Sequence, residues 1–399
     1  MSQLISVDDA VDHILAHQPM QKIETLSIAN ALGRRLAKPV IARTTHPPAA
    51  MSAMDGYAVR LADVAAPQSR LTVIGEAPAG APFAGSVSPG ESVRVFTGSV
   101  IPDGADHIVI QEDAARDGNT VLIEAAHTQA RHIRTEGLDF QTGDELIPAG
   151  EMLTPMHVSV IAASNNAQVD VQVPLRVGLL ANGDELRQPG SALKFGDIIN
   201  SNQFGLSGLI QAWGGQAINL GIASDSVDSI HERMAAEPDI DIFLPIGGAS
   251  VGDHDHVRAA FLAARFDSLF EKIAVRPGKP TWLFKRDRQI VLGLPGNPAS
   301  ATVCAHLFLS PLLGTDWRQK LVTAQISDAL PANGPREQYM RARAAISSAG
   351  TVEAAPIHNQ DSSLLTPFLS SNALIRRPAN APPSEPGSAT QLLFIAPII

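Results

Sequence analysis

Three glycine-rich turns suggest where this chain does chemistry. They lie at residues 247–255 (GGASVGDHD), 276–280 (RPGKP) and 293–300 (GLPGNPAS). The first and third each follow an apolar run of strand character, at 240–246 and 290–294, and each leads into a helical pattern. Glycine at a strand end lets backbone N–H groups approach an anion, and the N-terminus of the next helix adds partial positive charge. The turns therefore predict a binding site for a phosphorylated ligand.

Carboxylates stand beside these turns. Asp253 and Asp255 lie in the first turn, and Glu185 follows an earlier predicted strand. Their hard oxygens suit Mg²⁺, which binds one or two protein carboxylates together with phosphate oxygens and water. Each carboxylate alone could equally be the N-cap or first-turn charge of a helix, where acidic residues are favoured regardless of function. Because all three fall at one edge of the predicted sheet, we expect them to bind a metal ion.

Two cations, Arg276 and Lys279, flank a Pro-Gly turn that presents them on a rigid backbone. A solvated surface turn is the alternative interpretation. The chain has a net charge of −10, and one carboxylate about 4 Å from a phosphate repels it by roughly 4 kcal/mol at an effective dielectric constant near 20. A phosphate beside several carboxylates therefore requires a bridging Mg²⁺ or local cations.

The composition limits the classes of protein to which this chain can belong. At 399 residues and 45% hydrophobic content the chain can form several domains with their own cores. Its negative charge argues against a nucleic-acid or anionic membrane surface. It shows no signal peptide and no apolar run of about eighteen residues. The single cysteine, Cys304, lies in an apolar stretch, which predicts a buried structural thiol. We expect a cytoplasmic protein that binds neither nucleic acid nor membrane.

Strands and helices alternate along residues 174–316, which predicts an α/β domain with a doubly wound, mostly parallel sheet. In such sheets ligands bind beyond the carboxyl ends of the strands, where the three turns lie. The predicted strands are 175–181, 217–222, 240–246 and 290–294, and the predicted helices are 203–213, 226–234, 256–264 and 300–312.

The rest of the chain is predicted to form three further regions, so the fold class is a multidomain α/β plus β protein. Short β-rich runs between Pro/Gly turns predict an inserted β domain at 44–140, with strands at 71–75, 92–96, 107–111 and 120–123. Apolar helical spacing from Val7, behind an N-cap at Ser6, predicts a helical linker region at 1–43 and 141–173, with a short helix at 28–32. Runs at 321–326, 338–345 and 392–395 predict a C-terminal β-barrel-like domain at 317–399.

Two further motifs, Ser52–Ala58 (SAMDGYA) and Asn182–Leu186 (NGDEL), complete a pattern of five. In this order the motifs resemble the molybdopterin molybdenumtransferases, the transferase family that includes bacterial MoeA proteins and the gephyrin E domain. The resemblance covers essentially the whole chain. It implies Mg²⁺-dependent insertion of molybdenum into molybdopterin, using adenylylated molybdopterin and molybdate and giving molybdenum cofactor and AMP. It also implies a homodimer with a shared active site, and a molybdopterin adenylyltransferase as a candidate partner.

The resemblance also assigns residues. From the sequence alone, Asp55 is a turn former and Asp225 a helix N-cap, and only the resemblance places them in the site. The implied catalytic residues are Asp55, Asp139, Glu185, Asp225 and Asp255. The implied ligands of the pterin and its anionic groups are Thr97, Gly247, Gly248, Ser250, Arg276, Lys279, Pro295, Gly296, Asn297 and Ser362. The implied metal ligands are Glu185 and Asp255, with Asp253 as an accessory.

Three positions depart from the family pattern. Asn182 and Ile246 stand where the family has threonine and serine, so each removes a hydroxyl. Arg276 stands where the family usually has lysine, and its planar fork is not equivalent to a point charge at an anion site. These departures are the only support for a non-catalytic molybdopterin-binding or scaffolding paralogue. A molybdopterin adenylyltransferase is the other alternative, but the Asp55 motif and the C-terminal β domain argue against it.

Overall fold

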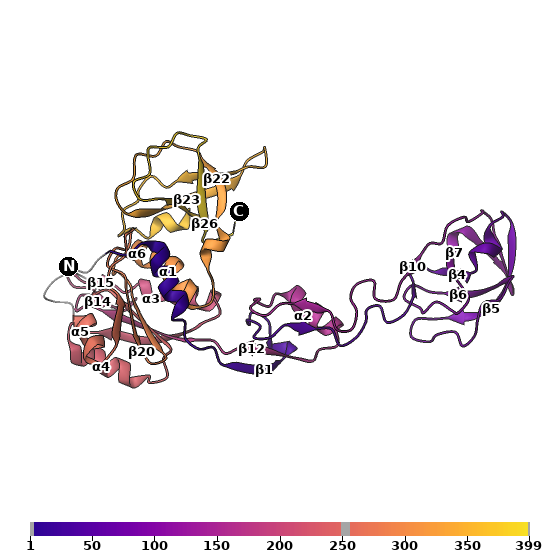
Figure 1. The fold of residues 1–399 in the computed structure, drawn as a ribbon, viewed down its shortest axis with the longest axis horizontal. Coiled ribbons are helices and arrows are strands. Elements are labelled where there is room, and N and C mark those ends of the chain that lie inside the picture. The colour runs from indigo at the N-terminus through magenta and orange to yellow at the C-terminus, as the bar shows by residue number, and fades with distance from the viewer. Residues whose placement is uncertain (1–3, 249–255, 398–399) are drawn as a thin grey trace. The chain divides into compact units, whose positions relative to one another are not determined.

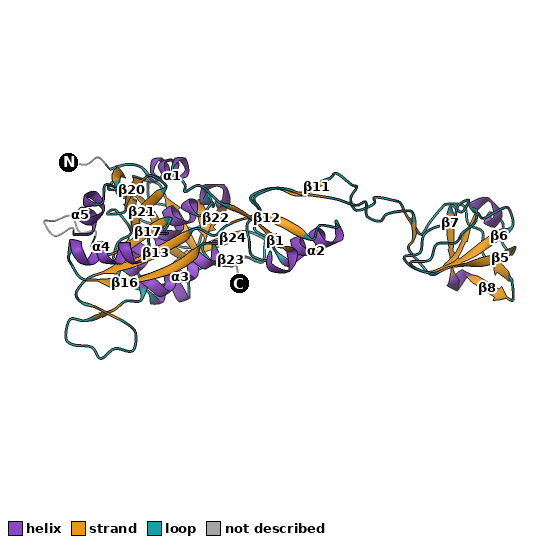
Figure 2. Cartoon of the chain, turned by 90° about the horizontal axis from the view of Figure 1, so that it is seen from below, coloured by secondary structure: helices purple, strands orange, loops and turns teal. Residues whose placement is uncertain are grey.

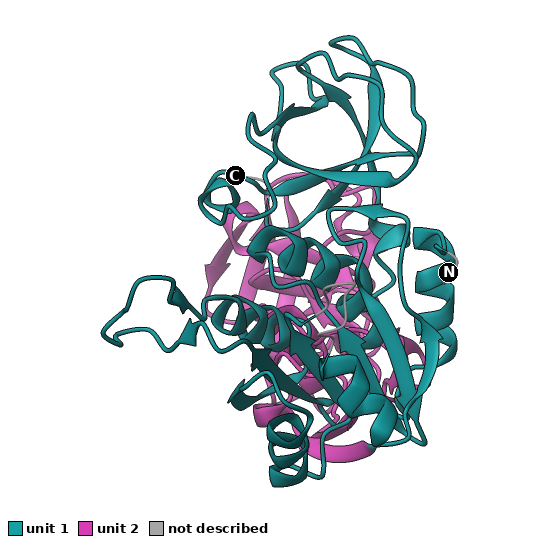
Figure 3. Cartoon of the chain, turned by 90° about the vertical axis from the view of Figure 1, so that its left-hand side faces the viewer, with its two compact units in different colours: residues 1–22, 173–399 teal, residues 23–172 magenta. Residues whose placement is uncertain are grey.

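The computed structural model describes residues 4–248 and 256–397 (Figure 1). The chain forms two compact units, which Figure 3 colours separately. Unit 1 comprises Met1–Lys22 and Val173–Ile399, and unit 2 comprises Ile23–Gln172. Strands and loops make up most of unit 2, whereas unit 1 contains most of the helices (Figure 2). Among the described residues, no helix is both long enough and apolar enough to cross a membrane.

A six-stranded sheet forms the β domain of unit 2. Its strands are β4 (Gly56–Val59), β5 (Ser69–Ala77), β6 (Glu91–Val95), β7 (His107–Ile110), β8 (Ala114–Asp117) and β9 (Thr120–Ile123), in the order β7-β4-β6-β5-β9-β8. The four predicted strands correspond to β5, β6, β7 and β9 and are confirmed. The sequence analysis missed β4 and β8. All four residues of β4 are buried and β8 is mostly exposed, so neither strand shows an alternating pattern.

Short paired strands and one helix make up the rest of unit 2. The helix α2 (Pro155–Ala163) begins behind Thr154, whose hydroxyl accepts a hydrogen bond from the backbone N–H of His157, as an N-cap should. The short helix predicted at 28–32 is a single 3₁₀ turn, η1 (Ile28–Asn30). The antiparallel pairs are β1 (Ile23–Ser27) with β12 (Gln168–Gln172), β2 (Val40–Ile41) with β11 (Glu145–Ile147), and β3 (Met51–Ser52) with β10 (Ile133–Arg134).

The α/β region of unit 1 is built on a second six-stranded sheet. In spatial order its strands are β16 (Gln216–Ala223), β13 (Arg176–Asn182), β17 (Ile242–Ile246), β21 (Gln289–Gly293), β20 (Trp282–Arg286) and β18 (Asp267–Phe270). The first four strands pair in parallel, whereas β20 is antiparallel to both β21 and β18. The predicted mostly parallel sheet is therefore confirmed, with an antiparallel edge that the sequence analysis did not include.

Helices cover both faces of this sheet. Alternate residues of β17 belong to different cores, with Ile242 and Leu244 in one and Phe243 in the other, as the two-residue period of a strand requires. The helices α3 (Asn202–Ala212), α4 (Val227–Ala236), α5 (His256–Ala263) and α6 (Pro298–Cys304) match the four predicted helices. The last of these continues through a π-helical turn, η4 (Ala305–Leu309), into α7 (Ser310–Leu312). A short parallel pair, β14 (Leu186–Arg187) and β15 (Ile198–Ile199), precedes α3.

The N-terminal helix α1 (Val7–Ala16) packs with unit 1. Ser6 caps it as predicted, because its hydroxyl accepts a hydrogen bond from the backbone N–H of Asp9. Its buried face, which includes Val11 and Ile14, joins the large core of the α/β region and packs against α7 and η4. The sequence analysis grouped this helix with the linker region. Helical spacing shows that a face is apolar but does not show which partner covers it.

Five strands close a C-terminal barrel. They are β22 (Val322–Ile326), β23 (Glu337–Ile346), β24 (Val352–Pro356), β25 (Ala373–Arg377) and β26 (Ala389–Phe394), with the 3₁₀ turns η5 (Trp317–Lys320) and η6 (Thr366–Leu369). Pairing runs from β23 through β24, β22, β26 and β25 back to β23. The predicted fold class is therefore confirmed. One strand from the α/β region, β19 (Val275–Arg276), adds to the barrel sheet by pairing in parallel with the start of β23.

Candidate functional site

Two of the predicted glycine turns meet at the carboxyl edge of the α/β sheet. Gly247 follows β17, and its backbone N–H donates to the carbonyl oxygen of Leu294 at 3.1 Å. A Cβ atom placed on Gly296 would lie 3.4 Å from the Cα of Gly247, so the two turns touch through their backbones. Gly248 has φ +67°, and a Cβ atom there would lie 2.3 Å from Cγ2 of Val257. Glycine is required at this position by both conformation and space.

Carboxylates gather at the ends of the neighbouring strands β13 and β16. The side-chain Nδ2 of Asn182 donates to Oδ1 of Asp225 at 2.6 Å, and the backbone N–H of Asp225 lies 3.4 Å from Oδ1 of Asp184. The Glu185 carboxylate folds back over Gly183, where an added Cβ atom would lie 2.5 Å from Oε2. We call Asn182, Asp184, Glu185 and Asp225 the carboxylate edge. The structure thus brings Glu185 and Asp225 to the same strand ends.

Three predicted site residues, Ser250, Asp253 and Asp255, lie outside the described residues. Their assignments stay predictions. Of the other residues in these turns, Pro295 is buried and Asn297 is exposed just before α6. Ile246, one of the three departures from the family pattern, is 4% exposed and belongs to the large core. Its side chain therefore packs in the protein interior.

The predicted cations line a cavity of about 370 Å³. Arg276 and Lys279 line it from the α/β region, and Arg336 and Ser362 line it from the barrel. We call it the cationic cavity. Its other lining residues are Pro277, Gly278, Pro280, Ser300, Gln338, Tyr339, Gln360 and Asp361. Three cations around one cavity can bind a small polyanion.

Buried contacts hold the Pro-Gly turn of this cavity in place. Gly278 has φ +120°, and a Cβ atom there would lie 2.2 Å from the Sγ of Cys304. The Thr281 hydroxyl donates to the Gly278 carbonyl oxygen at 2.8 Å. Burial raises the pKa of the Cys304 thiol to about 12, which confirms the predicted buried, unreactive cysteine. The turn that presents Arg276 and Lys279 is therefore supported from beneath.

The opposite wall depends on Arg341, which the sequence analysis missed. This residue is 2% exposed, and its guanidinium donates to the carbonyl oxygens of Asp361 and Leu364, each at 2.8 Å. These bonds shape the loop that carries Ser362. The Ser362 hydroxyl in turn accepts a hydrogen bond from Nδ2 of Asn297 at 3.0 Å, which joins the loop to the third glycine turn. The sequence offered no signal for this role, because Arg343 stands two residues further along the same strand and is exposed.

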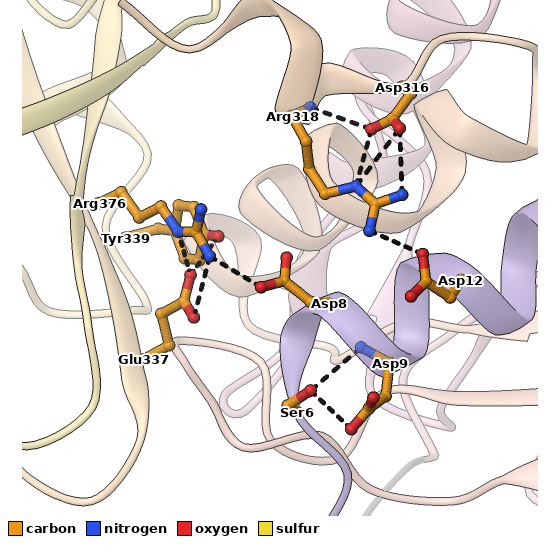
Figure 4. A network of polar contacts seen from close by, with 9 residues as sticks. All are labelled: Ser6, Asp8, Asp9, Asp12, Asp316, Arg318, Glu337, Tyr339 and Arg376. Atoms are coloured by element: carbon orange, nitrogen blue, oxygen red, sulfur yellow. Dashed lines mark hydrogen bonds and ion pairs between the residues drawn. The ribbon is translucent and has the colours of Figure 1, made fainter. Parts of the chain in front are cut away.

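Arg336 was also missed, although it is the third cation of the cavity. It directly precedes β23, where a charged residue looks like an ordinary solvated strand end. Its neighbour Glu337 forms an ion pair of 2.6 Å with Arg376, and Arg376 reaches Asp8 of α1 at 3.2 Å (Figure 4). This network joins α1 to the barrel next to Arg336 and Gln338. It fixes the part of β23 that lines the cavity.

In unit 2, the predicted site residues Asp55 and Thr97 contact each other. The backbone N–H and the hydroxyl of Thr97 donate to Oδ1 of Asp55 at 2.7 and 2.9 Å. These bonds hold the pKa of the Asp55 carboxyl below its ordinary value. Gly56 allows close strand packing, since a Cβ atom there would lie 2.0 Å from the Val109 carbonyl oxygen. Asp55 is thus a fixed, ionised carboxylate.

Asp139 lies on a different segment of unit 2. Its backbone N–H donates to the carbonyl oxygen of His46 at 3.0 Å, and its side chain is exposed. Among the described contacts, no hydrogen bond or ion pair joins Asp139 to Asp55. The role of Asp139 in the site stays a prediction.

Known protein families match nearly the whole chain. The family models described as "MoeA N-terminal region (domain I and II)", "Probable molybdopterin binding domain" and "MoeA C-terminal region (domain IV)" match residues 5–164, 178–315 and 323–394. A molybdopterin molybdenumtransferase of Nostoc sp. is 34% identical over 334 residues, covering 80% of this chain and 77% of the relative. The enzyme of the same name from Haemophilus influenzae is 31% identical and covers 93% of this chain and 94% of its own length.

Solved structures agree with this assignment. The molybdopterin biosynthesis MoeA protein of Pyrococcus horikoshii OT3 superposes with a TM-score of 0.83 and 26% sequence identity, covering 98% of this chain and 100% of that one. The chain belongs to the molybdopterin molybdenumtransferase (MoeA) family of transferases.

Proposed function

We propose that this protein inserts molybdenum into molybdopterin, using adenylylated molybdopterin and molybdate and releasing molybdenum cofactor and AMP. The observation that carries the proposal is the cationic cavity at one end of a family-typical α/β sheet. The bond between Asn297 and Ser362 joins the loop of this cavity to the third glycine turn, which supports binding of the oxyanion and the phosphates side by side. The name of the curated relatives, molybdopterin molybdenumtransferase, supports the transfer of molybdenum to molybdopterin.

The cavity suits molybdate because it offers charge and directed donors. Molybdate is a tetrahedral dianion, and Arg276, Lys279 and Arg336 supply three positive charges around the space. The Ser362 hydroxyl can donate a further hydrogen bond. Each charged hydrogen bond contributes roughly 1.5–3 kcal/mol to binding. The guanidinium forks favour a planar pair of oxygens, so Arg276 is expected to bind the oxyanion with two parallel bonds.

The carboxylate edge suits Mg²⁺. Glu185 and Asp225 provide hard carboxylate oxygens at adjacent strand ends, and the buried Oδ1 of Asn182 accepts no hydrogen bond from a described residue. Glu185 and Asp225 would hold the ion together with Asp255 and its accessory Asp253, whose assignments rest on the sequence and the family resemblance. When bound, Mg²⁺ would offset the charge of the phosphates as the pyrophosphate linkage is cleaved.

The chain's own groups then orient the two substrates. The backbone N–H groups of Gly248 and Gly296 would bind the phosphates beside Gly247, whose own N–H donates to Leu294, and the cations of the cavity would hold molybdate close to the pterin. Cys304 is buried beneath the Pro-Gly turn, so molybdenum would pass to the pterin without a protein thiolate. The reaction would be ligand exchange in a templated pocket.

We further propose a homodimer in which Asp55 and Thr97 complete the site of the partner subunit. The helix α2 supports a subunit contact, because Met156 is 69% exposed and Val160 is 36% exposed on the same side, four residues apart. The family resemblance supplies the arrangement. A molybdopterin adenylyltransferase would deliver the adenylylated substrate.

The test is an assay of the purified chain with adenylylated molybdopterin, molybdate and Mg²⁺, measuring AMP release and active cofactor. We expect both products, and we expect neither when Mg²⁺ is removed by a chelator. Tight binding of the pterin without AMP release would identify a non-catalytic binding protein. Conversion of molybdopterin and ATP to the adenylylated form would identify an adenylyltransferase instead.

A further inference from the structure

One polar atom of the carboxylate edge is buried without a partner. Asn182 is 6% exposed at the end of β13, and its Nδ2 donates to Oδ1 of Asp225 at 2.6 Å. Its Oδ1 is buried and has no hydrogen-bond donor among the described residues. Buried amide oxygens are normally paired, since an unpaired one loses its hydrogen bonds to water without replacement. The unpaired oxygen therefore indicates that a bound ligand supplies its missing partner.

The orientation of this amide is fixed by its neighbour. Exchanging Oδ1 and Nδ2 of Asn182 would place the amide oxygen against Oδ1 of Asp225, and two acceptors at 2.6 Å repel each other. Asp225 can only accept when it is ionised. Nδ2 of Asn182 is therefore the donor to Asp225, and Oδ1 is an acceptor that has no donor among the described residues.

The surroundings favour a cation as the missing partner. Asp184 accepts from the backbone N–H of Asp225, and the Glu185 carboxylate folds over Gly183, the residue that follows Asn182. Among the described residues, no lysine or arginine forms an ion pair with Asp184, Glu185 or Asp225. No group of three or more His, Cys, Asp or Glu side chains among the described residues could hold a metal ion, so an amide oxygen beside Asp225 and Glu185 would supply a further hard ligand of the kind that Mg²⁺ and Mn²⁺ bind.

We propose that Asn182 Oδ1 is a direct ligand of the divalent cation, together with Glu185 and Asp225. The inference rests on the proposed function only for the presence of that cation. It gives a role to a residue that departs from the family pattern, because an amide oxygen takes the place of a hydroxyl. Nδ2 positions Asp225, so one side chain both binds the ion and orients a second ligand.

The experiment measures Mn²⁺ binding to the full chain without substrates, by calorimetry and by electron paramagnetic resonance. Asn182→Leu has a similar volume but no acceptor, and should weaken Mn²⁺ binding by about 10–100-fold. Its melting temperature without metal should stay the same or rise, because the unpaired buried oxygen is gone. Asn182→Asp keeps an oxygen and adds charge, so it should bind Mn²⁺ at least as tightly as the original chain. Asp228→Asn, which removes an exposed carboxylate of α4, is the matched control and should change nothing.

Three results would overturn the proposal. If Asn182→Leu binds Mn²⁺ normally while Glu185→Gln does not, the cation site stands but Asn182 is not a ligand. If Asn182→Asp weakens binding as much as Asn182→Leu, only the bond from Nδ2 to Asp225 matters. If the original chain binds no Mn²⁺ at millimolar concentration, the cation is absent without substrate and the inference fails. AMP release that continues in a chelator would then count separately against the proposed function.

Discussion

The carboxylate edge and the cationic cavity of unit 1 are assembled in different ways. The edge comes from residues 182–185 and from Asp225, at the ends of two strands that pair in parallel. The cavity comes from four separate places in the chain: residues 276–280, Ser300, residues 336–339 and residues 360–362. The first two belong to the α/β region and the other two to the barrel. The carboxylate edge requires only that β13 and β16 pair, whereas the cationic cavity requires that the α/β region and the barrel pack against each other.

This difference predicts how substitutions act. Groups of the carboxylate edge depend on hydrogen bonds to near neighbours, so only changes at the edge itself should disturb it. The walls of the cavity depend on Arg341 and Cys304, neither of which lines it. Anion binding should therefore respond to residues outside the cavity more strongly than metal binding responds to residues outside the edge.

The largest effect is expected at the edge. Glu185→Gln and Asp225→Asn should each lower the rate of AMP release by roughly 10²–10³-fold, because a metal ligand or positioned charge is lost where negative charge develops. Turnover measured at saturating Mg²⁺, with melting temperatures as a folding control, checks this prediction. Near-normal turnover in both variants would show that the edge is only structural.

The cavity should show an intermediate effect. Arg276→Ala and Arg336→Ala should each weaken molybdate binding by about 1.5–3 kcal/mol, which is about 10–100-fold, for one lost charged hydrogen bond. Arg276→Lys should retain binding if charge alone matters and weaken it if the guanidinium binds two oxygens. Arg343→Ala is the control, since this exposed arginine lies on the same strand as Arg341. Calorimetry with unchanged affinity for Arg276→Ala would remove it from the anion site.

Partial recovery of activity in mixed dimers is a smaller effect, and it tests whether unit 2 completes the carboxylate edge of a partner subunit. Asp55→Ala and Glu185→Ala should each be inactive alone. After the two proteins are unfolded together in equal amounts and refolded, half the dimers should be mixed and each should carry one intact site. Activity should then return to about a quarter of the original value for two-fold symmetry. No recovery, with subunit exchange verified by mixed affinity tags, would place the whole site within one chain.

The last effect concerns the core of unit 1, where the ring of His306 packs edge-on against Trp213. His306 lies in η4 directly after Cys304 and Ala305, and burial lowers its pKa to about 4. The unfolded chain binds a proton below about pH 6.5 and the folded chain does not, so unit 1 should lose stability as the pH falls from 6.5 to 4. The slope should be at most about 1.4 kcal/mol per pH unit.

Denaturant unfolding of the full chain across this pH range checks that prediction. His306→Phe fills the same buried space without a titrating group and should flatten the slope of unit 1. His13→Gln, at an exposed histidine of α1, should leave the slope unchanged. An unaltered slope in His306→Phe would mean that other groups cause the loss of stability in acid.

The sequence by itself determined the carboxylate edge to a large extent. Parallel strands end at the same side of a sheet, so alternating strands and helices predicted that Glu185 and the glycine turns lie at one edge, whereas only the family resemblance assigned Asp225 to the site. The turn around Gly278 was also visible, because a Pro-Gly step between two cations has few conformations. Local periodicity and turn chemistry carry this information within short windows.

Only the tertiary structure showed which residues of the barrel form the second wall of the cationic cavity. Arg336 and Arg341 look alike in the sequence, yet one lines the cavity and the other is buried and holds the loop of Ser362. The unpaired oxygen of Asn182 likewise appears only when β13 and β16 lie side by side and Asp225 takes the amide's donor. These features depend on which strands pair although they are far apart in the chain, and on which residues each side chain then contacts. A local pattern of residues does not contain that information.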